Sequence, residues 1–282
     1  MRRLLPLLVL PLLLLLAWLG YQALFEGLGG TSLTVATVEG IVARDRAGVR
    51  LPMLAGDTIG ANDRIRAGAG GRAVLDAGEG TRMVLDAGAD VQVVSVASDE
   101  VHVALEGGRL RATVRAEGAR VAVGAGADTF SLRDADATLA RDGDVVAVEV
   151  ERGAVEATAA GRSVRASAGE RLVVTASEAE VDAANEELLL TLAESPSMTR
   201  ALDLEVRGRT FARARVRVGQ TGTWTEGRAD PSGRFALRVP LREGANAITV
   251  ESVDVLGRAA QQEVRVVRDT RAPVLGVEVQ LR

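Results

Sequence analysis

Short runs in which apolar and polar residues alternate make up most of the chain after position 30. Valine occupies positions 146, 148 and 150, for example, with small or acidic residues between them. A period of two is typical of a β-strand that has one buried and one solvated face. Between Leu33 and Val174, glycine and aspartate interrupt such runs about every eight to twelve residues. The pattern therefore predicts an all-β domain over residues 31–176.

An internal repeat lies inside this domain. The segment Arg72–Gly78 reads Arg-Ala-Val-Leu-Asp-Ala-Gly, and Arg82–Gly88 reads Arg-Met-Val-Leu-Asp-Ala-Gly. Each copy is long enough for one strand and one turn. Because two copies are too few to establish a solenoid, a β-sandwich, a jelly roll and a short β-helix all remain open.

The composition changes after position 176, where alanine, glutamate and leucine replace valine and glycine. Ser177 and Glu180 have the spacing of a capping box, which begins many helices. Apolar residues then follow at helical spacing on one face, namely Val181, Ala184, Leu188, Leu189 and Leu192. We therefore predict a short connecting α-helix in a linker over residues 177–200, ended by Ser195-Pro196.

Strand-like alternation returns from Leu202 onward and predicts a further domain over residues 201–282. Turn sequences separate the runs at Asp230–Gly233, Glu243-Gly244 and Leu256-Gly257. About seven short strands fit this length, which is typical of a β-sandwich of the immunoglobulin type. The predicted core residues are Phe235, Leu237, Val239, Ile248 and Val250.

An almost unbroken apolar run, Leu4–Phe25, lies near the N-terminus. As a helix it would extend roughly 33 Å, enough to cross a bilayer core of about 30 Å. A cleavable signal peptide is the alternative, but no Ala-x-Ala site follows the run. We therefore predict a membrane anchor, a transmembrane helix within residues 1–30. Arg2 and Arg3 would stay inside, so we expect a single-pass protein of the bacterial inner membrane with periplasmic C-terminal modules.

The residue types present argue against most catalytic chemistry. The chain has no cysteine and one histidine, His102, so thiol chemistry and histidine-rich metal sites are ruled out. The sequence contains no nucleophile elbow, P-loop or dinucleotide fingerprint. Paired carboxylates, Asp134 with Asp136 and Asp142 with Asp144, are better explained by turns than by a calcium loop. We predict a non-enzymatic protein with no cofactor and no metal.

Arginines and one tryptophan in the C-terminal domain are the candidate ligand contacts. Arg213, Arg215 and Arg217 alternate with apolar residues and would share one face of a strand. Such a stripe suits an anionic cell-wall polymer or polysaccharide, although a solvated face is the simpler explanation. Trp224 is either part of the core, which we favour, or a platform on which a sugar stacks. With a net charge of −4, the chain is not expected to bind nucleic acid.

Several short motifs follow one another in the first domain. They are Val38–Val42, Leu54–Ile59, Asn62–Gly68, the two copies of the internal repeat, Leu105–Leu110, Val150–Val155 and Ala168–Glu170. In this order they resemble the FecR domain family over residues 33–174. One element departs from the family, since Gly124–Phe130 stands where members usually have Gly-Thr-x-Phe. The resemblance implies a periplasmic β-domain.

The best-known FecR proteins are inner-membrane regulators. Their cytoplasmic N-terminal region contacts a sigma factor, while the FecR domain senses a periplasmic receptor. In this sequence only Met1, Arg2 and Arg3 precede the apolar run. We therefore expect no direct anti-sigma activity.

Turn sequences of the C-terminal domain also follow a known order. They are Val206–Gly208, Asp230–Phe235, Leu241–Asn246, Asp254–Gly257 and Asp269–Pro273. Over residues 202–273 this order resembles bacterial immunoglobulin-like (Ig-like) domains, which are accessory units of envelope proteins. The resemblance implies a module that stabilises, spaces or binds.

Two functional hypotheses follow. In the first, the chain is a non-enzymatic, membrane-anchored envelope protein whose FecR-like and Ig-like modules bind a protein or a cell-wall polysaccharide. In the alternative, it is the periplasmic sensory component of a cell-surface signalling system. The alternative requires a separate membrane partner that relays the signal.

Overall fold

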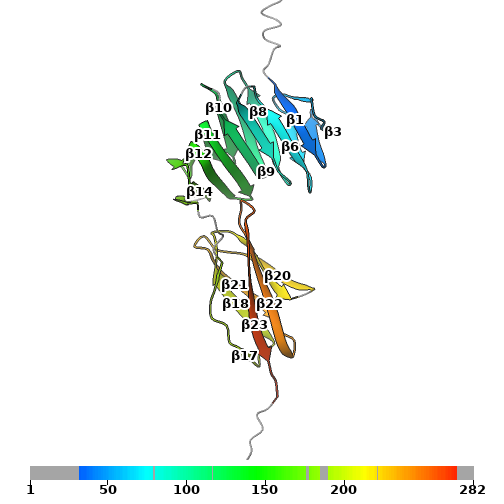
Figure 1. Cartoon of the computed structure of the whole chain (residues 1–282), viewed down its shortest axis with the longest axis vertical. Helices are drawn as coiled ribbons and strands as arrows, with labels where there is room; N and C mark the ends of the chain where they lie inside the picture. Colours follow the sequence, from blue (N-terminus) through cyan, green and yellow to red (C-terminus); the bar gives the residue numbers. More distant parts are fainter. Residues whose placement is uncertain are drawn as a thin grey trace, which may run out of the picture. The chain divides into compact units, whose positions relative to one another are not determined.

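The structure, a computed structural model, describes residues 32–271 except 79, 116, 176–177, 185–189 and 221. Contacts divide the chain into two units, Met1–Ala183 and Ala184–Arg282, whose strands are drawn in Figure 1. Each unit has its own apolar core. Both units are built of β-strands, so the prediction of a mainly β fold is confirmed. The apolar run Leu4–Phe25 and its predicted helix lie outside the described residues. Among the residues that are described, no helix is long and apolar enough to cross a membrane.

Unit 1 consists of two layers of strands around one core. The first layer runs in hydrogen-bonded order through β3 (Val49–Pro52), β2 (Val42–Arg46), β5 (Arg64–Ala67), β8 (Asp90–Val96), the start of β9 (Glu100–Val114), β10 (Arg120–Ala125), the start of β11 (Asp128–Asp142), the end of β12 (Val145–Ala159) and β13 (Arg162–Ser167). The second layer runs through β4 (Thr58–Ile59), β1 (Leu33–Glu39), β6 (Arg72–Asp76), β7 (Thr81–Leu85), the end of β9, the end of β11, the start of β12, β14 (Glu170–Val174) and β15 (Ala179–Ala183). Paired strands in both layers are antiparallel, except that β10 is parallel to β9.

Each layer turns its apolar face toward the core. Buried residues alternate with more exposed ones along the strands, as Val91 and Val93 do in β8 and Leu110 and Ala112 do in β9. Side chains from both layers belong to one apolar cluster, in which Phe130 is the single aromatic residue among those that the structure describes. Burying a valine or leucine side chain contributes about 1.5–3 kcal/mol, so many such residues form a core with very few aromatics.

Three long strands, β9, β11 and β12, pass from one layer to the other and join them. Each contains a residue with a positive φ angle where it changes layer: Gly108 at 78°, Asp134 at 43° and Gly153 at 74°. A Cβ atom added at Gly153 would lie 2.3 Å from the carbonyl oxygen of Asp134. The backbones of β11 and β12 therefore touch at their bends, and only glycine fits at position 153.

The internal repeat forms β6 and β7, which are neighbours in the second layer. They are antiparallel, with Ala73 opposite Leu85 and Leu75 opposite Met83. A β-helix would stack its repeats in parallel. Antiparallel pairing therefore favours the sandwich among the architectures that the sequence left open.

The helix predicted after position 176 is wrong for residues 179–183, which form strand β15. This strand pairs with β14 and forms hydrogen bonds with the backbone groups along the outer edge of β14. Val181 packs against the core of unit 1 as a strand residue, so tertiary pairing outweighs the helix propensity of alanine and glutamate. Leu192 likewise belongs to a strand. Three further residues of the predicted helix lie outside the described part of the chain: Ser177, Leu188 and Leu189.

Unit 2 is a sandwich of two sheets around a second core. The smaller sheet runs through β16 (Thr191–Leu192), β18 (Asp203–Arg209) and β21 (Arg234–Pro240). The larger sheet runs through β17 (Met198–Thr199), β23 (Ala259–Arg268), β22 (Gly244–Val253), β19 (Arg215–Gln220) and β20 (Thr223–Arg228). β17 is parallel to β23, and the other pairs are antiparallel.

Most of the core predicted for this unit is buried. Phe235, Val239, Ile248 and Val250 belong to the apolar cluster, whereas Leu237 is only partly buried and packs against it. The prediction of a β-sandwich is therefore confirmed, and the more specific Ig-like assignment stays a prediction.

We expect Gly153→Ala to destabilise unit 1 by about 3 kcal/mol or more, because a strained φ and a backbone clash occur together. Gly143→Ala is the matched control. Gly143 also has a positive φ, 65°, but a Cβ atom there would meet no atom within 4 Å. The control should cost about 1–2 kcal/mol. Urea unfolding measures both values, and equal losses would contradict the close packing at Gly153.

Candidate functional site

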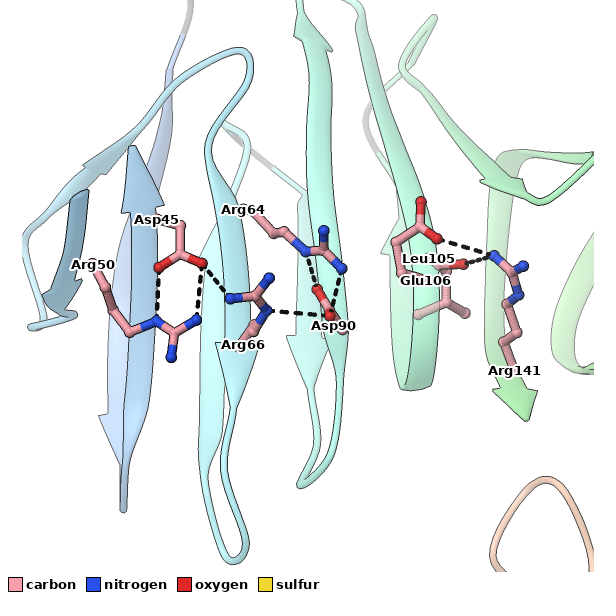
Figure 2. A network of polar contacts seen from close by, with 8 residues as sticks. All are labelled: Asp45, Arg50, Arg64, Arg66, Asp90, Leu105, Glu106 and Arg141. Atoms are coloured by element: carbon pink, nitrogen blue, oxygen red, sulfur yellow. Dashed lines mark hydrogen bonds and ion pairs between the residues drawn. The ribbon is translucent and has the colours of Figure 1, made fainter. Parts of the chain in front are cut away.

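A row of alternating arginines and aspartates crosses the outer face of the first layer of unit 1 (Figure 2). Asp45 of β2 lies directly opposite Arg50 of β3 and Arg64 of β5. Arg50 Nε donates to Asp45 Oδ1 at 2.9 Å, and Arg66 donates to Asp45 Oδ2. Arg64 donates to both oxygens of Asp90, at 2.6 and 2.7 Å, while Arg66 Nε is 3.3 Å from Asp90 Oδ2. The row ties four neighbouring strands together through side chains.

These contacts keep both aspartates ionised. Hydrogen bonds from Arg64 hold the pKa of Asp90 below its usual 3.8; Arg66 adds to this effect, and burial opposes it. The pKa of Asp45 is also lowered, chiefly by its hydrogen bond from Arg50. Ionised carboxylates whose charge is balanced by arginines stiffen a surface, but they are poorly placed to accept a proton from a substrate.

Arg141, also drawn in Figure 2, donates a hydrogen bond to a backbone carbonyl near a branch point of the sheet. Its Nη1 donates to the Leu105 carbonyl at 2.9 Å and lies 3.5 Å from Glu106 Oε2. The paired residues of β9 and β10 end at Ala104, after which β9 pairs with β11. Arg141 therefore supplies a donor where the ladder changes partner.

The paired carboxylates Asp134 and Asp136 lie at the bend of β11. Asp136 accepts hydrogen bonds from Arg115 at 2.9 Å and Arg152 at 3.1 Å, and Asp134 accepts one from Arg152 at 2.8 Å. Burial raises the pKa of Asp136, but the two arginines outweigh it and hold the pKa below its usual value. The described ranges contain no group of three or more His, Cys, Asp or Glu that could hold a metal ion. The pair pins the corner between β11 and β12.

In unit 2, the outer face of the larger sheet brings together three of the predicted ligand contacts, Arg215, Arg217 and Trp224. Arg217 Cζ lies 4.7 Å from the centroid of the Trp224 ring. Arg217 Nε also donates to Glu251 Oε2 at 2.5 Å, so a carboxylate holds the guanidinium over the indole. An open groove of about 440 Å³ is lined by Arg215, Val216, Arg217, Glu226, Gly227, Arg228, Glu251 and Val253.

Arg213, the fourth predicted contact, is separated from this face. β19 begins at Arg215, and Arg213 lies in the preceding turn with a φ of 60°. Its backbone N–H donates to the Asp230 carbonyl at 3.3 Å. The prediction that three arginines share one strand face is therefore wrong for Arg213, because the chain turns where the alternation continues.

The favoured interpretation of Trp224 as a core residue is also wrong. Its side chain is 38% exposed on β20, which lies at the edge of the larger sheet. No pattern in the sequence indicated Glu251, whose position opposite Arg217 depends on the register between β19 and β22. A shift of one residue would move Glu251 to the core side, so only the folded ladder places it beside Arg217.

By fold, the described part of unit 1 is a two-layered, all-β sandwich. Comparison with family models matches residues 63–156 to the model described as FecR protein. The matched segment runs from β5 into β12. The FecR resemblance is therefore confirmed for a central part of unit 1, which is about a third of the whole chain.

Two solved structures are similar to part of the chain. Both are of a protein from Parabacteroides distasonis ATCC 8503 that is provisionally described as an anti-sigma factor. Each is 21% identical, with a TM-score of 0.38, and the similarity covers 43% of this chain and 59% of the other. The chain thus spans less than two thirds of the length of those proteins. No curated protein matches the sequence.

The lowered pKa of Asp90 predicts a loss of stability in acid. The stabilisation is fully present above the ordinary pKa of 3.8 and is lost as pH falls through the lower folded value. We expect Asp90→Asn to cost about 1–2 kcal/mol at pH 7 and to make the stability curve shallower below about pH 4. Asp99→Asn, at an exposed turn, is the control and should keep the steepness of the unchanged protein. Urea unfolding from about pH 3 to 7 measures the slopes, and equal slopes for the two variants would contradict the role of Arg64.

Proposed function

We propose that the chain is the periplasmic sensory component of a bacterial cell-surface signalling system and that it acts through a separate membrane partner. The FecR match at residues 63–156 is the observation that carries this proposal. The matched segment contains β9 and β11 complete and most of β12, the strands that join the two layers. In this proposal unit 1 is the sensing module.

The anchor in this proposal is the apolar run Leu4–Phe25, with both units outside the cytoplasm. Its length as a helix, roughly 33 Å, and the preceding Arg2 and Arg3 support this topology. The helix would contact the partner within the bilayer and relay what unit 1 senses.

Unit 1 is suited to move as a rigid body. Backbone ladders, the aspartate–arginine row from Asp45 to Asp90 and the corner at Asp136 hold its strands. Because a stiff module does not rearrange locally when a receptor binds to it, the binding moves the module and the anchor together.

Unit 2 is proposed to be an Ig-like accessory domain. Its first strand is divided between the two sheets as β16 and β17, and β17 lies parallel to the last strand, β23. The order β23-β22-β19 in one sheet and β18-β21 in the other supports the assignment, because it corresponds to the G-F-C and B-E neighbours of immunoglobulin sandwiches.

Exchange of the anchor tests the sensory role. We expect deletion of the gene to change the transcription of a defined gene set and the full-length chain to restore it. A variant in which Leu4–Phe25 is replaced by an unrelated single-pass helix should be exported but should not restore transcription, because the contact with the partner is lost. RNA sequencing measures the response, and protease accessibility of unit 1 in spheroplasts checks export.

Trp224→Ala is the matched control for this experiment, since it leaves the anchor and unit 1 unchanged and should restore transcription fully. Full restoration by the exchanged anchor would rule out signalling through the helix. An unchanged transcriptome after deletion would rule out the sensory role altogether.

A second candidate function is that of a binding module for anionic cell-wall polysaccharide or an envelope protein. The exposed Trp224 with its stacked Arg217, beside the groove that includes Arg215, favours it. In this function a saccharide stacks on the exposed part of the indole, and the arginines pair with its carboxylates.

We expect Trp224→Ala to weaken binding of alginate oligosaccharides, used as acidic saccharide probes, by roughly five- to thirtyfold, because a stacking contact is worth roughly 1–2 kcal/mol. The control is Leu202→Ala, which truncates another exposed apolar residue of unit 2. Isothermal titration calorimetry measures both affinities. Equal affinities for the two variants would remove Trp224 from the site.

A further inference from the structure

The outer face of the smaller sheet of unit 2 carries a group of arginines that neither candidate function uses. Along β18 and β21, Val206, Phe235 and Val239 point into the core and are buried. Alternate positions point outward. Four of these outward positions are exposed arginines, which together form what we call the arginine face: Arg207, Arg209, Arg234 and Arg238.

Two of these arginines occupy directly opposed positions, since Arg209 pairs with Arg234 in the ladder between β18 and β21. Side chains at such positions begin about 4.5–5.5 Å apart, and like charges there destabilise a sheet. Within the described ranges, neither of these guanidinium groups forms an ion pair. Two positively charged side chains therefore project from directly opposed positions, and no carboxylate of the described ranges forms an ion pair with either of them.

Acidic residues nearby on the same strands are engaged elsewhere. Glu205 accepts a hydrogen bond from Arg207 Nε at 2.8 Å and lies 3.9 Å from Arg238 Nε. Asp203 lies opposite Pro240, at the other end of the ladder from Arg209. One glutamate is thus shared by two arginines, and the end that holds Arg209 and Arg234 remains positive.

Asp230 lies in the turn before β21 and is held by that turn. Its Oδ1 accepts hydrogen bonds from the Ser232 hydroxyl, from the Ser232 backbone and from the Arg234 backbone. The Ser232 hydroxyl is the largest cause of its lowered pKa, to which the charge of Arg234 also contributes. Asp230 therefore forms one wall of the region without pairing with the Arg234 guanidinium.

A hollow of about 630 Å³ opens at this end of the sheet. Arg207, Arg209 and Arg234 line it together with Thr191, Asp230 and Ala236. Its size exceeds that of one phosphate group, so a larger molecule that carries a phosphate can enter. Each guanidinium presents a planar fork of donors that matches the oxygens of a phosphate, and two opposed forks can share one such group.

We propose that the arginine face binds phosphate groups of an anionic envelope molecule, with Arg209 and Arg234 as the paired contacts. The bound phosphate replaces the missing carboxylate and removes the repulsion between the two side chains. This site lies on the smaller sheet of unit 2, whereas Trp224 and Arg217 lie on the larger sheet, so it is independent of both functions proposed above.

Calorimetric titration of the purified full-length chain in neutral detergent with tripolyphosphate tests the site. We expect the double variant Arg209→Gln/Arg234→Gln to raise Kd at least tenfold. Arg242→Gln/Arg265→Gln is the matched control, because it removes the same charge from exposed positions of the same unit. The control should change Kd less than about threefold. Equal weakening in both double variants, or none in the first, would overturn the proposal.

A second variant, Arg209→Lys/Arg234→Lys, separates the effect of the bidentate guanidinium from the effect of its charge. Because it keeps both positive charges, it also tests the site if the glutamine variant fails to fold. We expect it to bind tripolyphosphate at least threefold more weakly than the unchanged chain, since lysine keeps the charge but loses the bidentate fork. Unchanged affinity in this variant would overturn the paired-fork geometry.

Binding to lipid nanodiscs distinguishes a phosphate of a lipid headgroup from a phosphate of a soluble molecule. If the ligand is a lipid headgroup, phosphatidylglycerol nanodiscs bind the unchanged chain more tightly than phosphatidylcholine nanodiscs do, and the glutamine pair abolishes the difference. If it is a soluble phosphate, the glutamine pair affects tripolyphosphate alone. Both results support the site, whereas an unchanged affinity of the glutamine pair for tripolyphosphate overturns it in either case.

Discussion

The meeting of two backbone bends, at Asp134 of β11 and Gly153 of β12, is the constraint on which unit 1 depends. Here two long strands leave one layer and enter the other, and there is no room for a side chain at position 153. Because the same strands contribute to both layers, neither layer can form its full ladder without the other. Arg152 and Arg115 reinforce the corner through Asp136. The core of small and branched aliphatic residues packs between the two layers, whose spacing is fixed by this corner.

Charge is organised differently on the outer faces of the two units. In unit 1, arginines alternate with aspartates across neighbouring strands, so Asp45 and Asp90 are each bonded to two guanidinium groups. In the smaller sheet of unit 2, Arg209 and Arg234 stand opposite each other. The first arrangement satisfies its own charges and stiffens the surface. The second leaves positive charge that an external anion can satisfy.

This difference suggests a division of roles between the units. In the proposed function, unit 1, whose central strands match the FecR family model, receives a protein partner and transmits movement. A smaller sandwich with an exposed Arg217–Trp224 stack and an arginine face is suited to bind envelope polymers or lipids. The proposed sensory and binding roles are compatible, since they would use different units of one chain.

Sequence alone determined the β class, four of the five core positions predicted for unit 2 and the FecR resemblance over residues 63–156, because alternation and turn residues act over a few neighbouring positions. It also placed Arg215 and Arg217 on one face of a strand. It did not determine that residues 179–183 join a sheet, that Arg213 leaves the strand, or that Trp224 is exposed on an edge strand. Nor could it place Glu251 opposite Arg217 or Arg209 opposite Arg234. Those relations depend on register between strands distant in sequence, and only the packed sandwich decides register.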